Sequence, residues 1–184
     1  MIIETCEESG SFDLPPYLEA LTDQLGDPDM VVVMDSGGPD YDHVWVTEAL
    51  RGLVSGTLSV KVSHEGIHSG NSGGSIPSSF RIQRILLDRV EDSATGRVLI
   101  PEMHVEIPQG VRDKAIALSE IVGGSIWDQF PTVDSLRQAS ETTEDMIIAM
   151  NWEPTLSIIG ADGMPSVQVA GNVLRTNTDL KLSF

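Results

Sequence analysis

The sequence predicts an α+β protein in which a βαβ unit precedes a small antiparallel sheet with helices on one face. Two observations carry this prediction. Residues 1–6 and 30–35 are short, apolar and rich in β-branched side chains, as buried parallel strands are. In contrast, "TLSVKVS" at 57–63 alternates apolar and polar residues, as a strand with one solvated face does. The pattern changes near residue 51, so we expect two parts, 1–50 and 51–184.

A helix is expected between the two parallel strands, over "DLPPYLEALTDQL" at 13–25. Asp13 is a suitable N-cap, and the two prolines that follow stand in the first turn, where a missing N–H does no harm. Leu18, Leu21 and Leu25 share one face of this helix, which can therefore cover one side of a sheet.

In the second part, two helices are expected to cover a small antiparallel sheet, one over about 77–92 and one over about 110–122. Their expected apolar stripes comprise Phe80, Ile82, Ile85, Leu86 and Val90 in the first helix, and Val111, Ala115, Leu118 and Ile121 in the second. "TLSII" and "LKLSF" supply two further strands, with "GADGMP" as the bend after the first, and the acidic, polar stretch 135–150 is assigned no element.

Charge and cysteine content exclude several classes of protein. The chain has 28 acidic and 11 basic residues and a formal charge of −17, which repels phosphate backbones and anionic lipid, so neither nucleic acid nor a membrane is expected as a partner. The single Cys6 cannot form an internal disulfide, which favours a reducing compartment, the cytoplasm. No apolar run approaches the roughly 18 residues of a membrane span, and the N-terminus lacks a signal-peptide pattern.

Three carboxylates follow the two expected parallel strands. Glu7 and Glu8 come after the first strand and Asp35 after the second, and carboxyl ends of parallel strands meet at one rim of a sheet. Adjacent residues of a strand point to opposite faces, so only an irregular turn in "ESGS" can bring both glutamates into one cleft. Three carboxylates together repel one another unless a divalent metal lies among them, and one that is not a ligand can act as a general base. The alternative is that these are solvated loop acids.

One histidine, His68, stands in "HEGIHSGNSGG" among small residues that let backbone approach a ligand, although a surface loop residue is the alternative. Apart from the HxxxH spacing of His64 and His68, the histidines are spread out along the chain, so a complete zinc site made of local ligands is absent from the sequence. Ser9, Ser11 and Ser36 do not stand in the GxSxG elbow of serine hydrolases, and "GNSGGS" lacks the lysine of a phosphate-binding loop. Cys6 is interpreted as a buried small hydrophobe.

The order of these motifs resembles a known family. The segments "ETCEESGS", "VVVMDSGGPDYD", "WVTEALRG", "TLSVKVSHEGIHSGNSGGSIP", "WEPTLSIIGADG" and "GNVLRTNTDLKLSF" together resemble the co-catalytic zinc metallopeptidases that include carnosine dipeptidase, aminoacylase and acetylornithine deacetylase. The resemblance covers nearly the whole chain in order.

The resemblance implies roles for individual residues. Glu7 matches the general base, Glu8 a ligand of one zinc ion and Asp35 a ligand of the other. His68 matches the lid histidine that polarises the scissile carbonyl in the partner's active site of a dimer, and Asn172 falls where relatives place a second polar group of that site. Residues 1–50 then look like part of the catalytic domain. Residues 51–184 look like the lid domain, a four-stranded antiparallel sheet with two helices on one face, through which relatives form homodimers.

The same resemblance implies a cofactor, a substrate class and an incomplete site. The complete enzyme would hold two zinc ions, with manganese or cobalt as alternative metals, and would cleave an amide bond of a small peptide or N-acyl amino acid beside a free carboxylate. The family's H-x-D segment, bridging aspartate and late histidine have no counterpart here, so this sequence is expected to be a portion of a longer enzyme, truncated at its last strand and inactive alone. The alternative is a non-catalytic dimerisation module with a vestigial site.

Overall fold

The structure is a computed structural model that describes residues 1–184, and the chain divides into two compact units, Met1–Gly37 and Gly38–Phe184. The first unit ends earlier than the boundary expected at residue 50, and no helix or strand lies between Gly38 and Val54. No helix combines the length and the apolar composition that crossing a membrane requires.

The first unit is helical and contains no strand. After a 3₁₀ turn, η1 (Glu7–Ser9), it forms α1 (Leu14–Ala20) and α2 (Thr22–Leu25), so the expected helix is present as two short ones. The two parallel strands expected at 1–6 and 30–35 are not formed, and this prediction is wrong. The physical reason is that two strands and one short helix cannot cover both faces of a parallel pair, so these apolar residues stay exposed.

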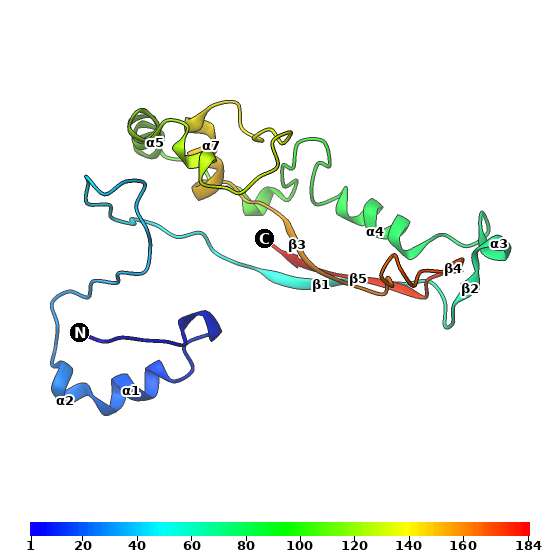
Figure 1. Ribbon diagram of the computed structural model, residues 1–184, viewed down its shortest axis with the longest axis horizontal. Helices are drawn as coiled ribbons and strands as arrows, with labels where there is room; N and C mark the ends of the chain where they lie inside the picture. Colours follow the sequence, from blue (N-terminus) through cyan, green and yellow to red (C-terminus); the bar gives the residue numbers. More distant parts are fainter. The chain divides into compact units, whose positions relative to one another are not determined.

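The main sheet of the second unit is antiparallel and three-stranded. It consists of β1 (Ser55–Lys61), β3 (Ser157–Asp162) and β5 (Asn177–Ser183) in the order β1-β5-β3, with Leu58 opposite Leu180. A separate pair, β2 (Ile67–His68) with β4 (Val173–Leu174), lies beyond it (Figure 1). The α+β class is confirmed, but a two-stranded pair and a three-stranded sheet replace the expected four-stranded one.

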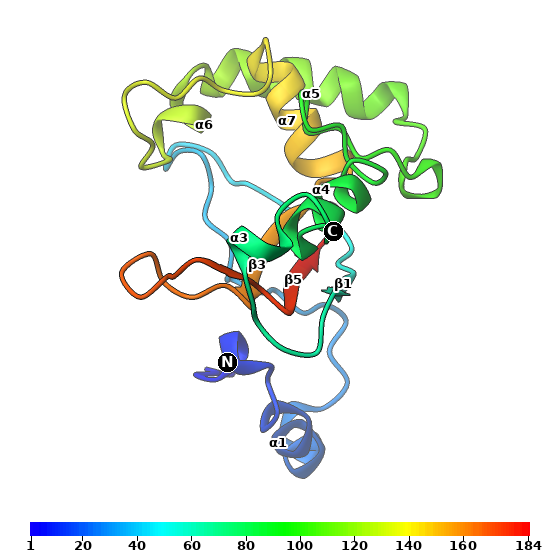
Figure 2. The same ribbon diagram turned by 90° about the vertical axis from the view of Figure 1, so that its right-hand side faces the viewer.

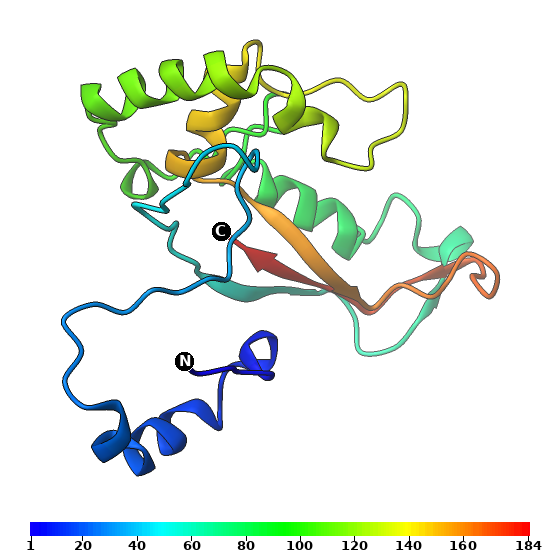
Figure 3. The ribbon, with the colours of Figure 1, turned by 60° about the vertical axis from the view of Figure 1, so that its left-hand side comes forward.

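Helices of the second unit lie on one side of the three-stranded sheet, as predicted (Figures 1 and 3). In chain order the helical elements are α3 (Ser69–Ser72), α4 (Ser79–Leu87), η2 (Pro101–Met103), α5 (Gln109–Val122), α6 (Ser125–Asp128) and α7 (Thr143–Trp152). Helix α4 contacts β1 and β5, whereas α5 and α7 contact each other.

Helix α4 meets the sheet through polar side chains. Ser79 and Gln83 are buried on it, and the Gln83 amide donates hydrogen bonds to the carbonyls of Leu58 (2.9 Å) and Thr178 (2.7 Å). Phe80 and Ile85, which the sequence placed in a buried stripe, are 44% and 50% exposed. The stripe prediction is therefore wrong for Phe80 and Ile85. The hydrogen bonds to strand carbonyls turn the face with Ser79 and Gln83 toward the sheet, and residue polarity alone does not reveal such bonds.

The helical core joins α5 to α7. Ala115 and Val122 of α5 are buried against Ile147 and Ile148 of α7. Helix α7 falls in the stretch 135–150 to which the sequence assigned no element. The sequence held a signal for this helix, the three-residue spacing of Thr142 and Asp145. In the structure the Thr142 hydroxyl accepts from the Asp145 N–H at 3.0 Å and donates to the Asp145 carboxylate at 2.7 Å, so Thr142 caps the N-terminus of α7.

Candidate functional site

Two of the five predicted site residues are brought together by the β2/β4 pair. His68 lies directly opposite Val173, and the N–H of Ser69 donates to the carbonyl of Asn172 at 2.9 Å. His68 in β2 and Asn172, just before β4, therefore belong to segments that lie next to each other although the chain between them is long. Figure 2 looks at the end of the second unit that carries β2, α3 and β4. Both residues are exposed to solvent.

The imidazole of His68 has a defined hydrogen bond. Its Nδ1 accepts from the Gly70 N–H at 3.1 Å, at the start of α3. A neutral imidazole that accepts at Nδ1 carries its proton on Nε2. The exposed Nε2–H has no partner in the protein, so His68 presents a hydrogen-bond donor to solvent or to a ligand.

The backbone of His68 is also held. The hydroxyl of Ser72 donates to the His68 carbonyl at 3.3 Å, and Ser72 is only 2% exposed. The N–H of Gly73 donates to the Ser69 carbonyl at 2.8 Å and closes the turn. The sequence analysis missed Gly70 and Ser72, although their spacing of two and four residues after His68 was a usable signal for local hydrogen bonds.

Glu7 and Glu8 lie in the irregular turn that the sequence required of them. Both are in η1, and the turn closes with the Gly10 N–H donating to the Glu7 carbonyl at 2.8 Å. Gly10 has φ of +99°, a conformation that glycine adopts without strain. Both carboxylates are exposed.

Asp35 lies in an exposed segment without secondary structure, near the end of the first unit. Nowhere in the structure do three or more His, Cys, Asp or Glu side chains converge as metal ligands would. The structure therefore does not bring the three predicted acidic residues together into a metal site.

A second polar cluster surrounds Asp40. Its carboxylate accepts from His43 Nδ1 at 2.9 Å, from the backbone N–H groups of Asp42 and His43, and from the Trp45 indole at 3.3 Å. Burial raises the pKa of Asp40, but the bonds from His43, Asp42 and Trp45 together outweigh it and lower the pKa below its ordinary value. These bonds order the first turn of the second unit.

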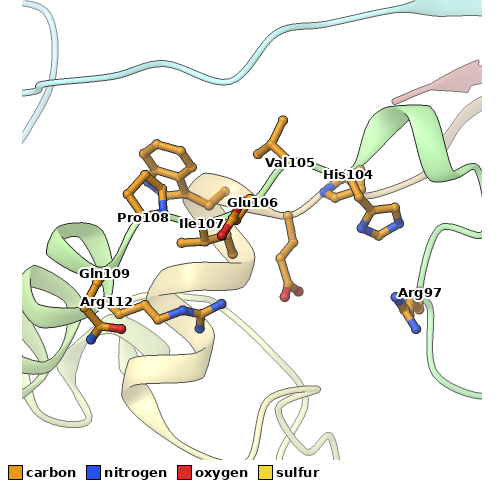
Figure 4. Close-up of a pocket in the computed structure, with 11 residues that line it drawn as sticks. Arg97, His104, Val105, Glu106, Ile107, Pro108, Gln109 and Arg112 are labelled. Carbon is orange, nitrogen blue, oxygen red and sulfur yellow. The ribbon is translucent and has the colours of Figure 1, made fainter.

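A hollow of about 600 Å³ in the second unit has no contact with His68. Residues 104–109 and the end of α7 line it, and Figure 4 shows Arg97 and Arg112 on opposite sides. Glu106 and Glu153 also line it, so it carries charges of both signs. None of the predicted site residues lines this hollow, which does not extend the candidate site.

No protein-family model matches the chain. Among solved structures, the di-peptidase Dug1p from Saccharomyces cerevisiae matches 98% of this chain with a TM-score of 0.65 and 22% identity. Human carnosine dipeptidase 1 matches 98% with a TM-score of 0.63 and 24% identity. The M20 family metallo-carboxypeptidase Sso-CP2 from Sulfolobus solfataricus matches 95% with a TM-score of 0.60 and 19% identity.

The chain spans 37%, 38% and 45% of the lengths of these three structures. At these identities the likeness establishes a shared fold. The resemblance drawn from the sequence motifs is therefore confirmed at the level of the fold, over nearly the whole chain.

Proposed function

We propose that this chain is a portion of an M20-type metallopeptidase or amidohydrolase that cleaves an amide bond beside a free carboxylate. Small peptides and N-acyl amino acids are the substrate class. Residues 1–50 contribute to the catalytic domain and 51–184 form the lid domain, through which the complete enzyme forms a homodimer. The observation that supports the proposal is the pairing of β2 with β4, which places His68 opposite Val173 and joins the neighbouring Ser69 N–H to the Asn172 carbonyl.

In this proposal, His68 and Asn172 act on the substrate carbonyl. The Nε2–H of His68 donates to the carbonyl oxygen and stabilises the negative charge that develops there, and the Asn172 amide is a second donor. Removal of one such donor typically lowers turnover about 10²- to 10³-fold. Glu7 is the general base for the attacking water.

The donor set of this chain does not by itself fit a metal ion. Glu8 and Asp35 offer oxygen ligands of a kind that zinc accepts, but no third ligand converges with them. Two zinc ions, or manganese or cobalt in their place, would supply the activated water in the complete enzyme.

The test uses the complete protein that contains this segment. Glu7→Gln is expected to abolish dipeptide hydrolysis while leaving the metal content unchanged, because it removes a base and no ligand. His68→Ala is expected to lower kcat strongly. If His68 serves the neighbouring subunit, mixing the two inactive variants restores part of the activity. Full activity of Glu7→Gln would contradict the assignment of the base.

A non-catalytic dimerisation module is the second candidate. Two observations support it. The predicted acidic site residues do not come together as metal ligands, and the second unit exposes apolar side chains such as Phe80 and Ile85 on α4, which a partner could cover. A folded dimer that binds no zinc and hydrolyses no dipeptide in its complete form would favour this candidate over the enzyme.

A further inference from the structure

We propose that Gly70 is a positioning residue for His68, because its N–H fixes the imidazole and its lack of a side chain leaves room for the ring. The inference rests on the proposed function, in which His68 donates a hydrogen bond to the substrate carbonyl. It adds a residue that acts through another side chain and does not itself touch the substrate.

The contact between Gly70 and His68 is close on two counts. The Gly70 N–H donates to Nδ1 at 3.1 Å. A Cβ atom at position 70 would lie 3.1 Å from both Nδ1 and Cε1 of the same ring. Since this is tighter than ordinary van der Waals contact, a side chain at position 70 would shift the imidazole by a few tenths of an ångström.

The backbone at position 70 gives no other reason for a glycine. Gly70 has a φ that any residue adopts, unlike Gly74, whose φ is +82°. The glycine at position 70 is therefore explained by the space that the His68 ring needs. Gly66 makes a comparable demand on the same strand pair, because a Cβ there would lie 2.8 Å from Val173 Cγ1.

The hydrogen bond decides what His68 can do chemically. An Nδ1 that accepts from a backbone N–H cannot carry a proton, so the neutral ring donates only from Nε2. A base, in contrast, would need an unprotonated Nε2. The contact with Gly70 therefore makes His68 a hydrogen-bond donor and excludes it as a proton acceptor at Nε2 while that contact persists.

The geometry is tested on the chain itself by NMR of uniformly ¹⁵N-labelled protein. A scalar coupling across the N–H···N bond is expected between the Gly70 amide nitrogen and His68 Nδ1, together with a proton on Nε2. In Gly70→Ala the coupling is expected to weaken or vanish. Gly52→Ala is the matched control, because nothing lies within 4 Å of its Cβ position, and it should retain the coupling. A wild-type protein without the coupling would overturn the inference, whatever its enzymatic activity.

The functional consequence is tested in the complete enzyme. Gly70→Ala is expected to lower kcat, by less than the roughly 10²-fold cost of misplacing a reacting group by about 1 Å, with little change in KM. Gly52→Ala should keep full activity. Full kcat in Gly70→Ala, in an enzyme that Glu7→Gln and His68→Ala inactivate, would overturn the positioning role but leave the proposed function intact. Activity that survives both of those changes would contradict the proposed function, and the NMR coupling would still decide the geometry.

Discussion

The first unit and the β2/α3/β4 end of the second unit treat their candidate site residues differently. In Met1–Gly37 no residue is buried, and Glu7, Glu8 and Asp35 are all exposed. In the second unit the ring of His68, its carbonyl and the following residue each have a hydrogen bond to a named partner. The motifs were equally clear in the sequence, but only one of them is built into a fixed geometry.

The two units differ because other elements pack over the apolar residues of the second unit but not over those of the first. The apolar segment 30–34 is exposed along its whole length, whereas β5 lies between β1 and β3 and beneath α4. The first unit also carries nine acidic residues and no basic one, so its charges repel. A functional side chain is held precisely only where its neighbours bury enough surface to order the backbone beneath it.

Truncation of an apolar side chain to alanine should reveal the largest difference in stability between the two units. Leu180 in β5 is 4% exposed, and Leu180→Ala is expected to lower the free energy of unfolding of the second unit by about 2–5 kcal/mol. Leu18 in α1 is 37% exposed, and Leu18→Ala should change stability by no more than about 0.5 kcal/mol. Urea unfolding followed by tryptophan fluorescence checks this, because all three tryptophans lie in the second unit. Equal effects of the two changes would contradict the comparison.

A glycine in each unit provides a second comparison. Gly163 has φ of +87°, and a Cβ there would lie 2.4 Å from the Asn177 carbonyl oxygen. Gly163→Ala is therefore expected to cost about 1–3 kcal/mol, with loss of the Arg175 hydrogen bond to the Gly163 carbonyl. Gly26 also has a positive φ but nothing within 4 Å, so Gly26→Ala should cost less. Circular dichroism during urea unfolding measures both, and a larger loss for Gly26→Ala would contradict the role of the Asn177 contact.

The fold was predictable from the sequence where the local pattern and the tertiary contacts agree. The strand β1 and helix α5 were found because alternation and an apolar stripe match their burial, although Ile121 of the predicted stripe is 54% exposed and Val122 is buried instead. The strands expected at 1–6 and 30–35 had the same local quality, but sequence pattern does not report whether another layer covers them. Helix α7 was missed since its polar cap residues read as a loop.

The roles of all five candidate site residues stay predictions. The pairing of β2 with β4 brings the segments of His68 and Asn172 next to each other, and the contact with Gly70 could not be found from residue types alone. Glu7, Glu8 and Asp35 are not brought together, because their positions depend on packing against other elements that a local sequence pattern does not report.

Loss of the buried amide on α4 should have an intermediate effect. Gln83 is fully buried and donates to carbonyls of two strands, so Gln83→Leu leaves those carbonyls without this donor and is expected to cost about 1–3 kcal/mol. The same change at Gln24 in α2, an exposed residue, should be within about 0.5 kcal/mol of neutral. The midpoint of urea unfolding measures both. A stabilised Gln83→Leu protein would mean that the free-energy cost of burying Gln83 Oε1 without a hydrogen-bond partner exceeds the stabilisation from the two bonds that the amide donates.

The smallest effect is expected at Asp40, in the first turn of the second unit. Its pKa lies below the ordinary value of 3.8, because the bonds from His43, Asp42 and Trp45 outweigh the opposing effect of burial. A lowered pKa in the folded state means that the carboxylate stabilises this turn fully above pH 3.8 and loses that contribution as the pH falls through the lower folded pKa. An NMR titration of the Asp40 side-chain carboxyl carbon should give a midpoint below 3.8, and His43→Ala should move it upward. A midpoint at or above 3.8 would show that these bonds do not hold the carboxylate in solution. Because Asp40 is only half-buried and its bonds all lie within residues 40–45, the titration should change the local order of the turn and leave the unfolding midpoint of the sheet almost unchanged.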